Sequence, residues 1–228
     1  MSERAHPDDR GFQDHWVWQR RCNGLLPWPQ RLRSPWKQGL LERYRFCQRF
    51  VAGRRVLDAP CGCGWGTSLL KRTRRLVGVD RDAESIAYAR RQYGHRAEFF
   101  VADMQQLPLE CGAFDVVICL EGIEHVDGEV GAQFVREAAR VLAPTGHLIL
   151  TSPEPDPRRA RNPYHLREYA RAELEALLAP YFTPEQVVLR PVGGVSVVYY
   201  VGIVRSRKLG GTAASMDGAT VEEFQAVG

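Results

Sequence analysis

The sequence has no long hydrophobic run. Its most apolar stretch covers residues 195–204, well short of the ~20 residues that a helix needs to cross a bilayer. The first ten residues, MSERAHPDDR, carry charges that no apolar segment follows, which is unlike a secretory signal. We therefore expect a protein without a membrane segment that stays in the cytosol.

The cysteine pattern of a disulfide scaffold or a structural zinc site is also missing. There are six cysteines in 228 residues, and Cys61 and Cys63 are too close in the chain for an unstrained bridge. No second cysteine or histidine pair with zinc-ligand spacing stands near them. Reduced thiols are the expectation.

Nor is there a strong excess of charge of one sign. The net charge is +4 and the pI is about 8.8, which is milder than in a dedicated nucleic-acid binder. Hydrophobic residues at 44% and charged residues at 25% match an ordinary globular chain. The length suits one domain with appendages.

The middle of the chain alternates short apolar runs with helical segments, which is typical of βαβ units and a parallel sheet. We expect strands at 55–58, 76–80, 97–101, 114–120 and 146–151. We expect helices at 67–74, 83–92, 130–142 and 172–178. Two β-rich runs, 186–191 and 195–204, then suggest a hairpin. The predicted fold is α/β: a doubly wound, Rossmann-like, seven-stranded sheet, mostly parallel, with a C-terminal antiparallel hairpin.

Three parts follow from composition. Residues 1–36 hold tryptophan and arginine without a clean period and predict an irregular arm, which either docks on the domain or stacks bases. Residues 37–208 form the domain and begin with an amphipathic helix as far as Val51. Residues 209–228 have the small, polar composition of a flexible tail.

The clearest chemical motif is a strand that runs into a glycine-rich turn, VLDAPCGCGWGT at 56–67. Three glycines let a ligand approach the backbone closely: Gly62, Gly64 and Gly66. Asp58 closes the first strand and Asp80 the second, so both face the crevice at the carboxyl ends of the strands. There Asp58 can hold an amine and Asp80 can accept hydrogen bonds from ribose hydroxyls. The site suits a nucleoside with an amine-bearing tail.

Five motifs in this order resemble those of class I S-adenosylmethionine-dependent methyltransferases of the small-molecule type. They lie at 56–64, 77–80, 102–104, 114–117 and 142–146. The likeness covers about residues 56 to 151 and is weaker as far as Phe182. It implies S-adenosylmethionine as cofactor and methyl transfer to a small-molecule acceptor, with a hydroxyl as the expected acceptor group.

The resemblance also implies the cofactor contacts. Asp58 and the 62–66 turn would hold the methionine part, Asp80 the ribose, and Asp103 with Met104 the adenine. The whole implied set is Asp58, Ala59, Pro60, Cys61, Gly62, Gly64, Asp80, Arg81, Asp103, Met104 and Leu120. Pro60 departs from the family's usual glycine and removes one backbone donor.

A second cluster, EGIEH at 121–125, follows the fourth predicted strand. Because that strand end faces the site, the acceptor would lie beside it. His125 could take a proton from a hydroxyl, since an imidazole titrates near working pH, and Glu121 could orient it or bind the substrate. These two are the predicted catalytic residues.

The same spacing resembles the divalent-metal motif of small-RNA 3′-terminal 2′-O-methyltransferases and of ubiquinone-pathway O-methyltransferases. Two carboxylates, Glu121 and Glu124, and one imidazole, His125, would suit a hard or borderline cation, with His165 as a fourth ligand. A packed, hydrogen-bonded or substrate-lining turn is the favoured interpretation, and no metal is assigned.

The loop at 162–169, NPYHLREY, follows the fifth predicted strand, where loops of this fold cover the acceptor. Its candidate substrate contacts are Tyr164, His165 and Arg167; docking of the loop through its tyrosines is the other interpretation. In the helix before the core, Tyr44 and Arg45 could close over the cofactor, although Tyr44 equally fits the apolar face.

Three alternative functions stay open. The arm and the EGIEH turn would suit a metal-assisted RNA 2′-O-methyltransferase. A nicotinamide-dependent oxidoreductase also uses a glycine-rich turn and an acidic second-strand end. A relative could bind the cofactor as a structural ligand only. The acceptor depends on pocket loops rather than on the sheet.

Overall fold

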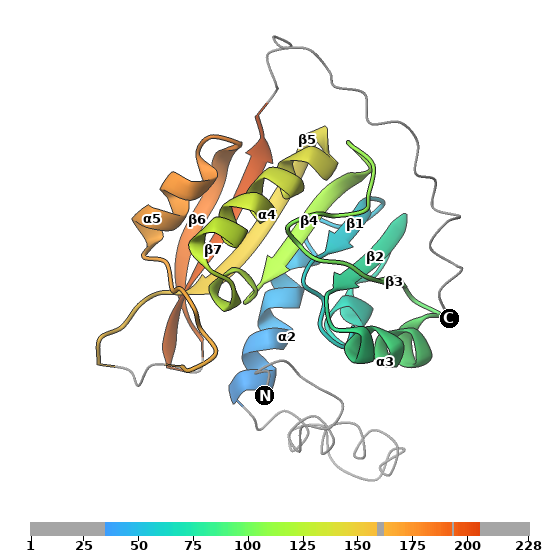
Figure 1. Cartoon of the computed structure of the whole chain (residues 1–228), viewed down its shortest axis with the longest axis horizontal. Helices are drawn as coiled ribbons and strands as arrows, with labels where there is room; N and C mark the ends of the chain where they lie inside the picture. The colour runs from blue at the N-terminus through green and yellow to red at the C-terminus, as the bar shows by residue number, and fades with distance from the viewer. Residues whose placement is uncertain (1–34, 159–161, 193, 206–228) are drawn as a thin grey trace.

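A computed structural model describes residues 35–158, 162–192 and 194–205 (Figure 1). The predicted tail at 209–228 lies outside the described residues, as do Gly193 of the predicted hairpin and most of the predicted arm. The helix that opens the domain begins at Pro35, two residues before the predicted start of the domain at residue 37. A proline suits the first turn of a helix, where its missing N–H costs no hydrogen bond.

Seven strands form one mixed sheet. They are β1 (Arg55–Asp58), β2 (Arg75–Asp80), β3 (Glu98–Val101), β4 (Phe114–Leu120), β5 (Leu142–Pro153), β6 (Phe182–Val192) and β7 (Val195–Val204). Their order is β3-β2-β1-β4-β5-β7-β6. Strands β1 to β5 are parallel, and β7 is antiparallel to both of its neighbours. This confirms the predicted α/β sheet with its antiparallel C-terminal pair.

Among the described residues, four α-helices and two short 3₁₀ turns precede or connect the strands. They are α2 (Pro35–Cys47), η2 (Thr67–Leu69), α3 (Ala83–Tyr93), η3 (Ile123–His125), α4 (Gly128–Val141) and α5 (Arg171–Leu178). The buried side chains form two main clusters, one joining α4 and α5 to the sheet and the other joining α2 and α3 to its opposite face. In Figure 1, α4 lies across the front of the sheet. The fold is therefore a three-layer sandwich.

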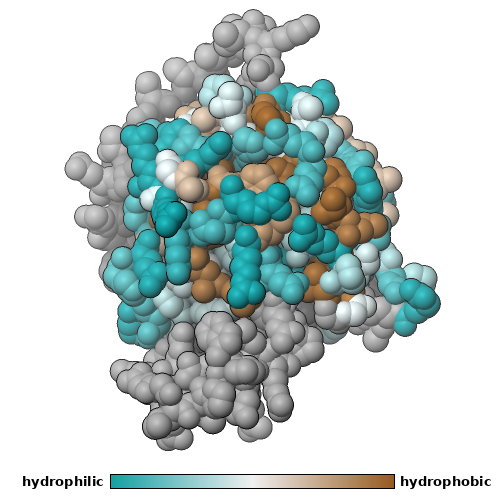
Figure 2. Space-filling view, turned by 180° about the vertical axis from the view of Figure 1, so that it is seen from behind, coloured by the Kyte–Doolittle hydropathy of each residue, from teal (hydrophilic) through white to brown (hydrophobic). Residues whose placement is uncertain are grey.

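The surface seen from behind mixes hydrophilic and hydrophobic areas (Figure 2), as on most globular proteins. No α-helix in the described ranges is both long and apolar enough to span a membrane. Five of the six cysteines lie in these ranges, and all five are free thiols.

The helix predicted at 67–74 is wrong. Only the 3₁₀ turn η2 forms there; Leu70 after it is extended, with φ −70° and ψ 132°, and Arg72 has φ +61°. Neither conformation belongs to a right-handed α-helix, so the helix does not continue beyond η2 and the chain bends before it enters β2.

Strand β6 forms one edge of the sheet and begins at Phe182, earlier than predicted. It contains Pro184 and Pro191, and its pairing with β7 shifts register between Pro184 and Gln186. Prolines are tolerated at a sheet edge, where an N–H that faces away from the sheet has no partner to lose.

Candidate functional site

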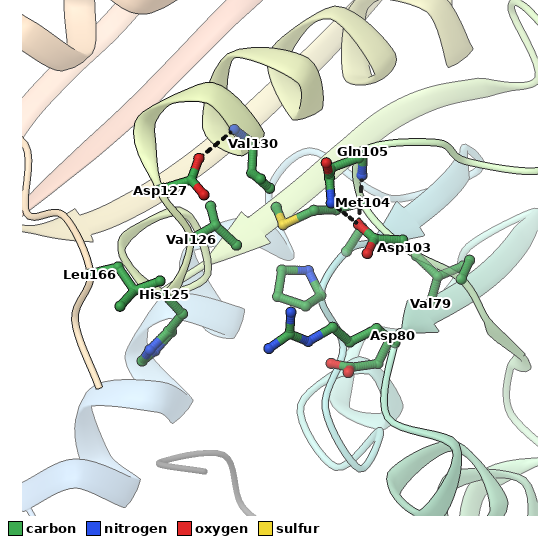
Figure 3. Close-up of a pocket in the computed structure, with 14 residues that line it drawn as sticks. Val79, Asp80, Asp103, Met104, Gln105, His125, Val126, Asp127, Val130 and Leu166 are labelled. Atoms are coloured by element: carbon green, nitrogen blue, oxygen red, sulfur yellow. Dashed lines mark hydrogen bonds between the residues drawn. The ribbon is translucent and has the colours of Figure 1, made fainter. Parts of the chain in front are cut away.

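A pocket of about 110 Å³ opens where β1, β2 and β3 end and α4 begins (Figure 3). Six of the eleven predicted cofactor residues line it: Ala59, Pro60, Asp80, Arg81, Asp103 and Met104. The predicted base, His125, lines the same pocket. Figure 3 shows Asp80 and Asp103 on one side and His125 with Leu166 on the other. One pocket thus joins the predicted cofactor site to the predicted catalytic turn.

Asp80 ties the end of β2 to the glycine turn. Its side chain is buried, Oδ2 accepts a hydrogen bond from the Gly62 N–H at 3.0 Å, and Oδ1 accepts one from the Asp82 N–H at 3.0 Å. The carboxylate orientation is therefore set by the backbone. Each carboxylate oxygen offers more than one lone pair, so Asp80 can still accept from a ribose diol.

Asp103 lies on the same side of the pocket as Asp80 (Figure 3), and its Oδ1 accepts hydrogen bonds from the backbone N–H of Gln105 at 2.9 Å and from its Nε2 at 3.2 Å. Met104 beside it is buried and lines the pocket. Other apolar lining residues were not predicted, namely Val79, Ala102, Val126 and Val130. A mostly apolar wall with a few fixed carboxylates suits a purine nucleoside.

The three glycines of the turn differ in the space that surrounds each Cα. Gly62 has φ +54° and nothing within 4 Å of where a Cβ would stand, so its backbone is open to a ligand. A Cβ at Gly64 would meet Phe99 at 2.7 Å, and one at Gly66 would meet the Tyr44 ring at 2.0 Å. At Gly64 and Gly66 the protein's own packing already requires glycine, while the expectation that a ligand approaches all three glycines stays a prediction.

Asp58, at the end of β1, is fully buried and does not line the pocket. Its Oδ2 accepts hydrogen bonds from the Tyr44 hydroxyl at 2.9 Å and the Thr67 hydroxyl at 2.6 Å, while Oδ1 has no partner. Burial raises the pKa of Asp58 to about 7, against the two hydrogen bonds, which lower it. A cationic amine at Oδ1 would satisfy this carboxyl, which fits the methionine part of S-adenosylmethionine.

Glu121 stands at the end of β4 with φ +49°, a conformation that is uncommon for a residue with a side chain. Its Oε1 accepts a hydrogen bond from the Thr151 hydroxyl at 2.9 Å, and its Oε2 lies 2.9 Å from Nη2 of the buried Arg43. Sequence analysis missed Arg43. A signal existed, because Arg43 lies three residues after Leu40 and four before Cys47, on the apolar side of the helix.

His125 has a defined tautomer when neutral. Its Nδ1 lies 3.0 Å from the carbonyl oxygen of Tyr164. Because a carbonyl can only accept, Nδ1 carries the proton and Nε2 the lone pair.

The neighbouring Glu124 is fully buried; Ser152 donates to its Oε2 at 3.4 Å, and Oε1 has no partner. The pKa of Glu124 lies well above its usual range because of burial and, secondly, of Glu121.

The loop at 162–169 docks on this turn. The backbone N–H groups of Leu166 and Arg167 donate to the Glu124 carbonyl at 2.8 and 3.1 Å. The His165 and His125 rings lie 5.1 Å apart, and His165 Nδ1 is 2.6 Å from Glu168 Oε1. Loop and turn therefore form one polar unit.

This unit contains a candidate metal centre. One ligand atom each from Glu124, His125 and His165 lies within 4.8 Å of the others, the single such group among the described residues. Glu121, the remaining residue of the predicted ligand set, instead contacts Arg43 and Thr151. Two imidazoles and one carboxylate are a usual ligand set for zinc and similar cations.

The other predicted substrate residues, Tyr164 and Arg167, differ in exposure and in contacts. Tyr164 is 38% exposed, whereas the Arg167 guanidinium stacks 4.7 Å from the Tyr169 ring and lies outside the pocket lining. Arg45 is exposed. Leu166, which was not predicted, lines the pocket although it is 60% exposed. An exposed leucine leaves no periodic signal in a loop.

Comparison with known proteins gives consistent results. Residues 56–146 match the model of a family described as a methyltransferase domain. A probable S-adenosylmethionine-dependent methyltransferase of Mycolicibacterium smegmatis is 38% identical over 133 residues, which cover 56% of this chain and 51% of that protein. A fatty-acid O-methyltransferase of the same species is 36% identical over 135 residues, covering 58% and 46%. The chain thus spans about half the length of these relatives.

A solved structure shares the fold. It is the 1,6-didemethyltoxoflavin-N1-methyltransferase of Burkholderia thailandensis, with bound 1,6-didemethyltoxoflavin and S-adenosylhomocysteine. It superposes with a TM-score of 0.62 at 21% identity and covers 76% of this chain and 82% of that one. The family match and the relatives distinguish this chain from the nicotinamide-dependent oxidoreductases. Together with the sheet order, they show that residues 56–146 form a methyltransferase domain similar to those of the class I S-adenosylmethionine-dependent enzymes.

Proposed function

We propose that the chain transfers the methyl group of S-adenosylmethionine to a hydroxyl of a small-molecule acceptor, with His125 as the base. The observation that supports this most directly is the position of His125 in the pocket, across from Asp80. With Nδ1 donating to the Tyr164 carbonyl, Nε2 is the ring atom of the neutral imidazole that can accept a proton. A base positioned in this way contributes roughly 10²–10⁴-fold to a rate.

When bound, S-adenosylmethionine supplies a methyl group that a nucleophilic oxygen takes by in-line displacement, with S-adenosylhomocysteine as the product. His125 accepts the hydroxyl proton at Nε2 as the oxygen forms its bond to carbon. Glu121, held by Arg43 and Thr151, fixes the start of the turn that carries His125. The apolar walls at Met104 and Val126 exclude water from the transfer.

Calorimetry tests the cofactor site first, and an acceptor panel tests the chemistry. Chelator-treated protein should bind S-adenosylhomocysteine. A panel of hydroxylated and carboxylated small molecules, including fatty acids because of the O-methyltransferase relative, then identifies the acceptor group. His125→Ala should lower turnover of a hydroxyl acceptor at least 100-fold and change cofactor affinity less than about threefold.

His147→Ala is the matched control, since this histidine lies in β5 and contacts Glu185 outside the pocket. Its turnover should match the wild type. A carboxylate acceptor is already deprotonated at neutral pH, so full activity of His125→Ala on fatty acids would exclude the hydroxyl assignment. Absence of S-adenosylhomocysteine binding would contradict the proposed function itself.

Metal-assisted O-methyl transfer is a second candidate, favoured by the group of Glu124, His125 and His165. The Nδ1 contact of each imidazole, with Tyr164 and Glu168 respectively, is the type of outer partner that orients metal-bound histidines. Restored activity on adding Mg²⁺, Mn²⁺ or Zn²⁺ to chelated enzyme, abolished in Glu124→Gln, would support it. Full activity after chelation would reject it.

An RNA acceptor for that reaction depends on the predicted arm at 1–36, of which the structure describes only Pro35 and Trp36. Its test is salt-dependent RNA binding that weakens when the arm is removed. Equal binding with and without the arm would separate the arm from acceptor recognition.

A further inference from the structure

Tyr44 reaches from α2 to the end of β1. Its ring is buried, and its hydroxyl donates to Asp58 Oδ2 at 2.9 Å. Thr67, in the turn η2, donates to the same oxygen at 2.6 Å. The two donors come from elements on either side of the glycine-rich turn, so the carboxylate is held from two directions.

The second carboxylate oxygen has no such partner. Asp58 Oδ1 is buried without a hydrogen bond, which is costly for an acceptor that has lost its water. Both local donors, Tyr44 and Thr67, are used on Oδ2. A ligand that brings an N–H group to Oδ1 would complete the carboxylate.

Tyr44 also supports the turn itself. Gly66 has ordinary helical dihedral angles, φ −64° and ψ −46°, so its conformation does not require glycine. A Cβ there would meet the Tyr44 ring at 2.0 Å. The preceding residue, Arg43, pairs with Glu121 at the end of β4. Consecutive residues of α2 therefore fasten this helix to the ends of two neighbouring strands.

We infer that Tyr44 is a positioning residue of the cofactor site: with Thr67 it holds Asp58 so that Oδ1 is left to accept a hydrogen bond from the amino group of the cofactor's methionine part. The inference rests on the proposed function, because it requires that S-adenosylmethionine binds here. In this inference Tyr44 acts through Asp58 and not by direct contact: it affects how tightly the site binds the methionine part of the cofactor.

Two ligands separate this role from a general structural one. S-adenosylhomocysteine carries the amino acid part, and 5′-methylthioadenosine lacks it. By calorimetry, Tyr44→Phe should weaken binding of the first about tenfold and of the second less than about twofold. Thr67→Val should give the same selective loss, and Thr67→Ser should behave as wild type. Tyr200→Phe, a buried tyrosine of β7, is the matched control and should change neither affinity.

Each outcome is decisive. Equal losses for both ligands would mean that Tyr44 serves packing alone, and an unchanged affinity for S-adenosylhomocysteine would also overturn the inference. Thr67→Val keeps the test valid if Tyr44→Phe fails to fold. A wild-type protein that binds neither ligand would refute the proposed function and this inference with it. A wild type that binds both, with its preference retained in Tyr44→Phe and Thr67→Val, would refute the inference alone.

Discussion

At the scale of single residues, Asp58 couples stability to pH. Its pKa is raised from 3.8 to about 7, chiefly by burial, so the folded protein binds a proton that the unfolded chain releases. The stability that this proton contributes is fully present below about pH 4. It is lost as pH rises toward 7 and remains lost above that value.

Asp58→Asn should remove this pH dependence. Between pH 5 and pH 8, the free energy of unfolding of the wild type should fall by roughly 1–3 kcal/mol more than that of the variant. Urea denaturation at several pH values measures both curves. Parallel curves would mean that Asp58 is ionised throughout, and the account of its burial would then be wrong.

How far the site could be predicted also depends on the kind of residue. The strand-end residues Asp58 and Asp80 follow from local pattern, because strand ends are readable in the sequence. The Arg43–Glu121 pair joins residues far apart in the chain, and the sequence around Glu121 does not predict which side chain pairs with it. Likewise, Gly66 is glycine because of Tyr44, a contact that only the folded packing creates.

At the scale of elements, the start of α4 links stability to the pocket. Asp127 is the N-cap: its Oδ1 accepts hydrogen bonds from the N–H groups of Glu129 at 3.0 Å and Val130 at 2.9 Å. Asp127 and Val130 also line the pocket. The hydrogen bonds that begin the helix therefore shape one wall of the site.

Asp127→Ala should lower the free energy of unfolding by about 1 kcal/mol, because two helical N–H groups lose their acceptor. Asp127→Asn keeps an acceptor oxygen and should lose only a few tenths. Urea denaturation at pH 7 compares the two. Equal losses would assign the effect to charge at the helix start rather than to capping.

Within the glycine turn, two alanine substitutions should differ in mechanism. Gly66→Ala keeps allowed dihedral angles but drives a Cβ into Tyr44, so we expect a loss of roughly 2 kcal/mol or more. Gly62→Ala meets no atom but has φ +54°, which costs about 1–2 kcal/mol. The double variant Gly66→Ala, Tyr44→Ala tests the first explanation, since it should recover part of the loss.

Element predictions failed for two different reasons. The segment at 67–74 has helix-forming residues, but Leu70 is extended and Arg72 has φ +61°, so no helix continues beyond η2. The predicted β5 and β6 were too short: pairing with β7 extends β5 to Pro153 and starts β6 at Phe182, and β5 starts at Leu142, which pairs with Phe114 of β4. Pairing of that kind depends on a partner strand and not on the segment's own pattern.

At the scale of the whole molecule, the sheet itself was predictable because its strands are continuous apolar runs separated by helices and turns. The order of strands also explains the site. β1 and β4 are neighbours, with the chain crossing to opposite sides of them, and a ligand crevice forms at such a reversal. Loops beyond the strand ends, such as 162–169, have no regular hydrophobic period, so their contacts could not be predicted from the sequence.

Cofactor binding should stabilise the entire fold. S-adenosylhomocysteine at about 100 times its Kd should add ~2.7 kcal/mol to the free energy of unfolding, visible as a rise in Tm. Asp80→Ala should keep a cooperative transition but lose the shift, since it removes the proposed ribose contact. Asp115→Ala, whose carboxylate pairs with Arg55 instead, should retain it. A full shift in Asp80→Ala would contradict the assignment of the site.

The prolines of β6 affect whether the sheet edges of two copies can pair. An exposed sheet edge can recruit a strand from another copy and so begin aggregation. Pro184 and Pro191 offer no N–H to such a strand, and the register shift beside Pro184 interrupts a regular ladder. The opposite edge, β3, is only four residues long. Both margins of this sheet thus discourage growth by strand addition, which protects a domain whose central strands are strongly apolar.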